Sequence, residues 1–160
     1  MPTALEKALR ATKKFPLSPD LWKILGAISQ DLNRGEVAVA AFRQAVALSG
    51  DDPVNHSNLA MALHGQGRMS EAILSLRRVT ELDPSDADAH YNLGVLLKES
   101  GHFKEAIESY RKALNLNPEV AEAFNNLGIL LCEQGRLGEG IDAYRMALSV
   151  QPNYWEALLN

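Results

Sequence analysis

The sequence repeats itself every 34 residues, and this period restricts the fold more than any local feature does. A leucine recurs at that step and is followed each time by glycine or alanine: Leu25, Leu59, Leu93 and Leu127. A period of this size is typical of stacked repeat proteins, in which each unit packs only on its neighbours. Such stacks present extended surfaces, which favours binding over catalysis.

Further positions keep their chemistry from repeat to repeat. With the leucine numbered as position 7, position 20 is very small, position 24 is bulky, and position 27 is alanine or valine. These sets are Ala38, Ala72, Ala106 and Gly140; Phe42, Leu76, Tyr110 and Tyr144; and Ala45, Val79, Ala113 and Ala147. Residues three and four apart share one face of a helix, so the pattern predicts a helix that packs closely against a partner.

Residues typical of helix starts, of turns between helices and of helix ends recur at the same period. Position 15 is glycine in three repeats, which predicts a tight turn between a first helix, helix A, and a second, helix B. Position 32 is proline in three repeats, which predicts the end of helix B, and the residue before position 1 is expected to cap helix A. In that order the residues are Gly67, Gly101 and Gly135; Pro84, Pro118 and Pro152; and Ser18, Asp52 and Asp86.

This pattern resembles the tetratricopeptide repeat (TPR), a helix–turn–helix unit with the consensus W-x2-L-G-x2-Y, then A-x3-F, then A and P. The first repeat matches it at Trp22, Leu25, Gly26, Ala38, Phe42 and Ala45. The third repeat matches it at Tyr91, Asn92, Leu93, Gly94, Ala106, Tyr110, Ala113 and Pro118. The resemblance implies an all-α fold, a right-handed superhelical α-solenoid of antiparallel helix pairs.

The expected organisation is a single array over residues 1–160. Residues 1–18 form a lone helix B, residues 19–52, 53–86, 87–120 and 121–154 form four repeats, and residues 155–160 start a further helix A. Because solenoids finish with polar caps, the uncapped C-terminal end predicts a segment of a longer protein. Uncovered apolar residues at both ends predict end-to-end self-association. They are Leu5, Ala8, Ala11, Trp155, Leu158 and Leu159.

In the TPR family helix A lines a concave groove, and position 6 of that helix is here mostly asparagine. An asparagine amide can pair with both the N–H and the C=O of a passing backbone, so an asparagine ladder could hold an extended peptide. In this respect the segment 124–128, Phe-Asn-Asn-Leu-Gly, resembles the TPR arm of O-linked N-acetylglucosamine transferase and related bacterial multi-repeat proteins. The alternative is that these asparagines bond locally between repeats.

Other groove positions set the chemistry of the expected ligand. Position 9 is apolar and forms either a contact stripe or a partly buried seam between helices A. Acidic residues at position 2 favour a basic ligand. We therefore expect an extended peptide or protein segment, basic or apolar. The candidate residues are Asn58, Asn92, Asn126, Asn160, Tyr91, Asn125, Met61, Val95, Ile129, Lys98, Asp88 and Glu122.

No catalytic or metal-ligating constellation stands out in the sequence. The four histidines lack the i, i+4 spacing of a helical metal site and Cys132 is the single cysteine, so we expect no metal and no cofactor. Without a phosphate loop or a nucleophile elbow we expect no catalysis within this segment. A pI of about 5.6 argues against nucleic acid as a partner. No apolar run approaches the ~18 residues that span a membrane, and a cytoplasmic protein is expected.

Three functions stay open at this point. The first is a protein–protein interaction scaffold that binds an extended peptide in its groove. The second is the substrate-recruiting arm of a larger enzyme, of a glycosyltransferase-like or sulfotransferase-like kind. The third is a module whose repeats drive self-assembly.

Overall fold

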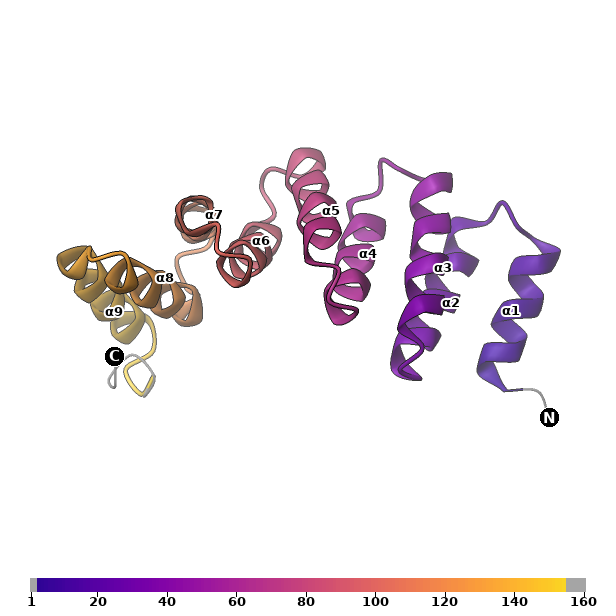
Figure 1. Ribbon diagram of the computed structural model, residues 1–160, viewed down its shortest axis with the longest axis horizontal. Helices are drawn as coiled ribbons and strands as arrows, with labels where there is room; N and C mark the ends of the chain where they lie inside the picture. Colours follow the sequence, from indigo (N-terminus) through magenta and orange to yellow (C-terminus); the bar gives the residue numbers. More distant parts are fainter. Residues whose placement is uncertain (1–2, 155–160) are drawn as a thin grey trace. The chain divides into compact units, whose positions relative to one another are not determined.

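The computed structural model describes residues 3–154, and within that range the chain is helical apart from short connecting loops. It divides into two compact units, unit 1 (Met1–Pro84) with α1 to α5 and unit 2 (Ser85–Asn160) with α6 to α9 (Figure 1). The helices are α1 (Ala4–Lys14), α2 (Pro19–Asp31), α3 (Gly35–Leu48), α4 (Pro53–Gly65), α5 (Met69–Leu82), α6 (Ala87–Glu99), α7 (Phe103–Leu116), α8 (Ala121–Glu133) and α9 (Leu137–Val150). Trp155, Leu158, Leu159 and Asn160 lie outside the described residues.

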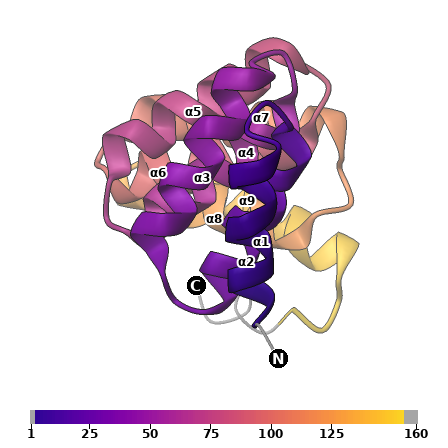
Figure 2. The ribbon, with the colours of Figure 1, turned by 90° about the vertical axis from the view of Figure 1, so that its right-hand side faces the viewer.

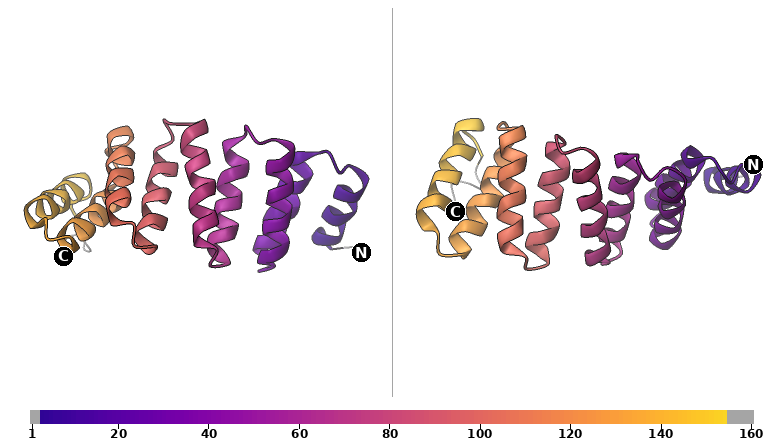
Figure 3. Two further views of the ribbon diagram at one scale, coloured as in Figure 1. Left: turned by 45° about the horizontal axis from the view of Figure 1, so that its top comes forward. Right: turned by 90° about the horizontal axis from the view of Figure 1, so that it is seen from above.

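Both units are built from antiparallel helix pairs, in which a helix A packs against the helix B that follows it (Figure 3). The pairs are α2 with α3 and α4 with α5 in unit 1, and α6 with α7 and α8 with α9 in unit 2. Consecutive pairs meet through α3 and α4 in the first unit and through α7 and α8 in the second. This pairing is the architecture of an all-α solenoid.

α1 is a single helix that packs on α2, and Figure 2 brings this end of unit 1 toward the viewer. The expectation that Leu5 and Ala8 are uncovered is wrong, because both are buried together with Leu25 and Ala41 where α1 packs on α2. A capping box starts the helix: the Thr3 hydroxyl accepts from the Glu6 N–H, and the Glu6 carboxylate accepts from the Thr3 N–H. α1 therefore packs on α2 in the way that α3 packs on α4. In both cases a helix B packs against the helix A of the next repeat.

The four helices A begin at the first residue of each sequence repeat, Pro19, Pro53, Ala87 and Ala121. Asp52 and Asp86 cap two of them as expected, because their carboxylates accept from the N–H groups of Val54 and Ala89, each at 2.9 Å. Ser18 differs from the expectation. It precedes α2 but makes no side-chain capping bond.

The turns between the helices of a repeat need a left-handed backbone at position 15. Gly67, Gly101 and Gly135 have φ values of 70°, 79° and 75° there, as the glycine pattern predicts. In the first repeat the same position is Asn33, with φ of 55°. Asparagine is among the few residues with a side chain that tolerate this region, so the turn survives without glycine.

Position 8 of helix A and position 24 of helix B are matched in size. A Cβ added at Gly94 would lie 2.8 Å from two ring carbons of Tyr110, which is 0% exposed. In the same way, a Cβ added at Gly26 would lie 2.5 Å from the Phe42 ring, and one added at Gly128 would lie 2.6 Å from the Tyr144 ring. The second repeat instead pairs Ala60 with Leu76. An aromatic ring on helix B thus lies directly on the backbone of helix A, and where the ring is absent a methyl group appears.

Candidate functional site

The helices A carry most of the candidate residues on one face, which we call the A-face. Positions 2, 5, 6, 9, 12 and 13 fall within about a third of a turn at 3.6 residues per turn. In unit 2 the A-face belongs to α6 and α8. Three of its candidates are exposed: Asp88, Asn92 and Glu122. Five are half-buried: Tyr91, Val95, Lys98, Asn126 and Ile129.

A polar cluster joins α6 to α8 on this face. Asn126 Nδ2 donates a hydrogen bond to the Tyr91 hydroxyl oxygen at 3.0 Å. Burial is the main reason that the pKa of Tyr91 is raised; the nearby Glu122 carboxylate raises it further, and the Asn126 amide acts in the opposite sense. Tyr91 therefore stays protonated and joins α6 to α8 through Asn126.

The ring of Tyr110 supports this cluster from the interior. The Tyr91 and Tyr110 ring centroids are 5.9 Å apart with the planes tilted by 46°, a favourable aromatic arrangement. Burial raises the pKa of Tyr110, and its hydroxyl has no hydrogen-bond partner among the residues described. The cluster on the A-face of unit 2 thus rests on a buried aromatic ring and has little freedom to move.

Charge distinguishes the two units. Residues 1–84 carry ten Lys and Arg against nine Asp and Glu, whereas residues 85–160 carry six against eleven, which together give the chain its net charge of −4. Part of the acidic excess lies on the A-face of unit 2, at positions 2 and 13 of α6 and α8. These exposed residues are Asp88, Glu99, Glu122 and Glu133. The face can attract a cation through its rim and offer amide groups at its centre.

The A-face of unit 1 is different in character. Lys23 is held by Asp20 at 2.9 Å and by Asp52 at 3.5 Å, and the bond to Asp20 is the main reason that its pKa is raised. Met61 is 59% exposed, whereas Asn58, at position 6, is half-buried. This face is therefore largely neutral, with an apolar side chain in solvent.

Asn125 departs from the expected groove set. Its side chain is buried, at 5% exposure, and so is not offered to a ligand. Tyr91 at the same position of the preceding repeat is half-buried, so the burial of a side chain at position 5 depends on the neighbouring helix. Asn55 is a further buried asparagine: its Nδ2 donates to the carbonyls of Ser49 (2.9 Å) and Ala45 (3.4 Å) at the end of α3. Both residues are part of the interior rather than of the A-face.

Ion pairs join consecutive helices B. Arg43 on α3 pairs with Glu71 on α5, and Arg111 on α7 pairs with Glu139 on α9 at 2.8 Å.

Within the described residues, no group of three His, Cys, Asp or Glu side chains comes together to hold a metal ion. In residues 3–154, no helix has both the length and the apolar character needed to cross a membrane.

Comparison with known families identifies the repeat. Family models of the tetratricopeptide repeat match residues 2–53, 87–120 and 121–154, and a TPR repeat model matches residues 62–101. A comparison with curated proteins finds no match.

Solved structures of similar fold cover nearly the whole chain. A crystal structure of MamA is 22% identical with a TM-score of 0.89, over 95% of this chain and 89% of that chain. MamA from Desulfovibrio magneticus RS-1 is 19% identical with a TM-score of 0.85, over 94% and 85%. YrrB, described as a TPR protein with an unusual peptide-binding site, is 20% identical with a TM-score of 0.87, over 97% and 80%. At these identities the likeness shows the fold.

Proposed function

Because this chain belongs to the tetratricopeptide repeat family, we propose that it is a protein-interaction scaffold that holds an extended, positively charged peptide segment on α6 and α8. The observation that carries the proposal is the Tyr91–Asn126–Glu122 cluster, an oriented amide beside a carboxylate on an accessible helix face. The description of YrrB supports peptide binding as a use of this fold. The proposal needs no catalytic step.

The asparagines of unit 2 supply the contacts to the peptide backbone. Asn92 is exposed, so both its amide N–H groups and its carbonyl are available to a ligand. Asn126 uses Nδ2 to bond Tyr91, and its carbonyl oxygen therefore points to the other side of the amide, where it can accept from a peptide N–H. The Asn126–Tyr91 bond is a contact between repeats of the kind that the alternative interpretation expects. Our proposal adds that the Asn126 carbonyl and the Asn92 amide serve as the ladder for a peptide.

The acidic residues supply the preference for positive charge. Asp88 and Glu122 occupy the same position of consecutive repeats and are both exposed. Like-signed charges along a face raise the local concentration of a cationic ligand and speed its association, and salt screens the effect. A peptide with lysine or arginine is therefore expected to bind faster and more tightly at low salt than a neutral peptide of the same length.

The proposal is tested with peptides selected from a random 12-residue library displayed on phage. We expect the selected sequences to be enriched in lysine and arginine. Asn92→Ala and Asn126→Ala should each weaken the binding of such a peptide roughly 5- to 30-fold, because each removes one or two hydrogen bonds worth about 1 kcal/mol. Fluorescence anisotropy of the labelled peptide measures the affinity, and thermal unfolding checks that the fold persists.

The matched control is Asn115→Ala, which removes an exposed asparagine at the end of α7, a helix B. This variant should bind the peptide as the unchanged chain does. If all three alanine variants bind equally well, or if Asn115→Ala is the one that weakens binding, the peptide does not lie on the A-face of unit 2.

A further inference from the structure

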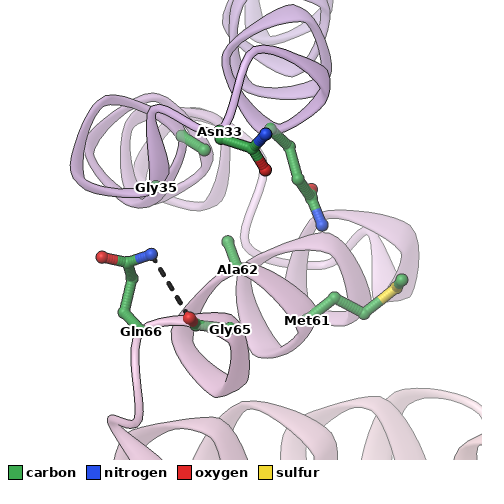
Figure 4. Close-up of a pocket in the computed structure, with 8 residues that line it drawn as sticks. Asn33, Gly35, Met61, Ala62, Gly65 and Gln66 are labelled. Carbon is green, nitrogen blue, oxygen red and sulfur yellow. Dashed lines mark hydrogen bonds between the residues drawn. The ribbon is translucent and has the colours of Figure 1, made fainter.

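A pocket opens in unit 1 between the turn that joins α2 to α3 and the C-terminal part of α4 (Figure 4). Its volume is about 320 Å³. The residues that line it are Gln30, Asn33, Gly35, Ala38, Met61, Ala62, Gly65 and Gln66. None of these described residues is charged, in contrast to the acidic A-face of unit 2. The pocket reaches the A-face of unit 1 through positions 9, 12 and 13.

Three residues that line the pocket are smaller than their counterparts in every other repeat. These residues are Ala62 at position 10, Gly65 at position 13 and Gly35 at position 17. Their counterparts are Ile28, Leu96 and Leu130; Asp31, Glu99 and Glu133; and Met69, Phe103 and Leu137. Small side chains at all three positions leave room for a ligand beside polar side chains, which is the usual composition of a binding pocket.

Three carboxamide side chains project around this space, from Gln30, Asn33 and Gln66. A Cβ on Gly35 would collide with the Gln66 amide, so the Gln66 side chain reaches into the room that the glycine leaves. The one hydrogen bond that Figure 4 draws within the pocket joins Gln66 Nε2 to the carbonyl of Gly65 at 3.4 Å, which is long. An amide held so weakly can turn toward a ligand at little cost.

We propose that this pocket binds a carboxamide side chain, that of glutamine or asparagine, carried by a peptide segment. A carboxamide is both donor and acceptor, so it can pair reciprocally with the pocket's own amides. A charged or an aliphatic side chain cannot pair in this reciprocal way, because neither carries both a donor and an acceptor. Met61, 59% exposed at the rim, offers its apolar stem to the methylene groups of the ligand.

This inference rests on the proposed function in one respect: the carboxamide side chain is taken to belong to the peptide segment that the chain binds. The affinity of the pocket for a carboxamide does not depend on it and can be measured with a small probe. The probe is N-acetylglutamine amide, compared with N-acetylglutamate amide and N-acetylleucine amide. For a ligand of this size we expect a dissociation constant of roughly 1 mM.

Binding is followed by nitrogen–proton NMR spectra of the 160-residue chain. The glutamine probe should shift the backbone signals of Gly35, Ala62 and Gly65, and the glutamate and leucine probes should bind at least roughly fivefold more weakly. Equal shifts with all three probes, or shifts confined to α6 and α8, would overturn the proposal.

Two variants locate the effect. Gly35→Phe places a ring where the Gln66 amide now lies, since even a Cβ on Gly35 would collide with that amide. It should abolish the glutamine-probe shifts, and its control, Gly138→Ala in open space at the start of α9, should not. Gln66→Leu changes an exposed side chain and should reduce the preference for the glutamine probe over the leucine probe. If both pocket variants keep that preference, the pocket is not the site.

The two proposals fail in different ways. If lysine-rich peptides do not bind α6 and α8 but the glutamine probe still shifts Gly35, the pocket assignment stands without the proposed function. If the peptides bind and the glutamine probe shifts no signal in unit 1, the pocket assignment is wrong and the proposed function is untouched.

Discussion

Replacing Gly94 with alanine is expected to lower the free energy of unfolding by about 1–2 kcal/mol, although alanine is the better helix former. The added methyl group would lie 2.8 Å from the Tyr110 ring, closer than such contacts normally occur. Tyr110 is 0% exposed and cannot move aside without disturbing its neighbours. The overpacking cost of about 1–3 kcal/mol outweighs a helix-propensity gain of about 1 kcal/mol. The melting temperature should fall by roughly 3–6 °C.

The second repeat provides the compensating change for this experiment, because it pairs Ala60 with Leu76. Tyr110→Leu alone leaves a cavity over Gly94 and should also destabilise the chain. The double variant should lose less stability than the sum of the two single losses, since the methyl group then fills part of the cavity. Gly138→Ala, with open space around the glycine, serves as the control and should not destabilise. Additive losses in the double variant would mean that positions 8 and 24 are not coupled.

Reversing the two acidic residues at position 2 of unit 2 is expected to have the largest effect on binding. The double variant Asp88→Lys with Glu122→Lys should weaken the binding of a lysine-rich peptide roughly 30-fold or more at low salt. The change replaces two attractions of up to about 1 kcal/mol each by repulsions and also removes the carboxylate near the Tyr91 hydroxyl. Anisotropy titrations at several salt concentrations measure both the loss of affinity and the loss of its salt dependence.

A control with the same total change in charge separates a local effect from a general one. Glu108 on α7 and Glu119 in the loop before α8 are exposed and lie outside the A-face. The pair Glu108→Lys with Glu119→Lys should reduce affinity only slightly, through the overall charge of the chain. If this pair reduces affinity as much as the position-2 pair does, the acidic residues act through net charge and not as a binding face.

Backbone features of this chain could be predicted from the sequence because each depends on chemistry that is local. The starts of the helices A follow from the 34-residue period, and the turns follow from glycine at position 15. Asn33 fills that position in the first repeat, where the glycine pattern alone gives no turn. Ser18 shows the limit of local reasoning, since its residue type predicts a cap and yet its side chain makes no capping bond.

Side-chain environments were harder to predict because they depend on the helix next door. Asn125 and Asn126 are adjacent in the sequence, yet the first is buried and the second lies on the A-face. The Tyr91–Asn126 bond joins position 5 of one repeat to position 6 of the next, so it is visible only when consecutive repeats are aligned. The pocket of unit 1 could also be found from the sequence, since an alignment of the repeats shows unusually small residues at positions 10, 13 and 17.

The most direct test of peptide binding on α6 and α8 is to locate the bound peptide. A lysine-rich peptide selected by phage display is given a nitroxide spin label, and nitrogen–proton spectra of the 160-residue chain are recorded with the label active and reduced. We predict that the active label weakens the side-chain amide signals of Asn92 and Asn126 and the backbone signals of α6 and α8 far more than those of α7 and α9. Strong weakening along α7 and α9, with the two asparagines unaffected, would contradict it.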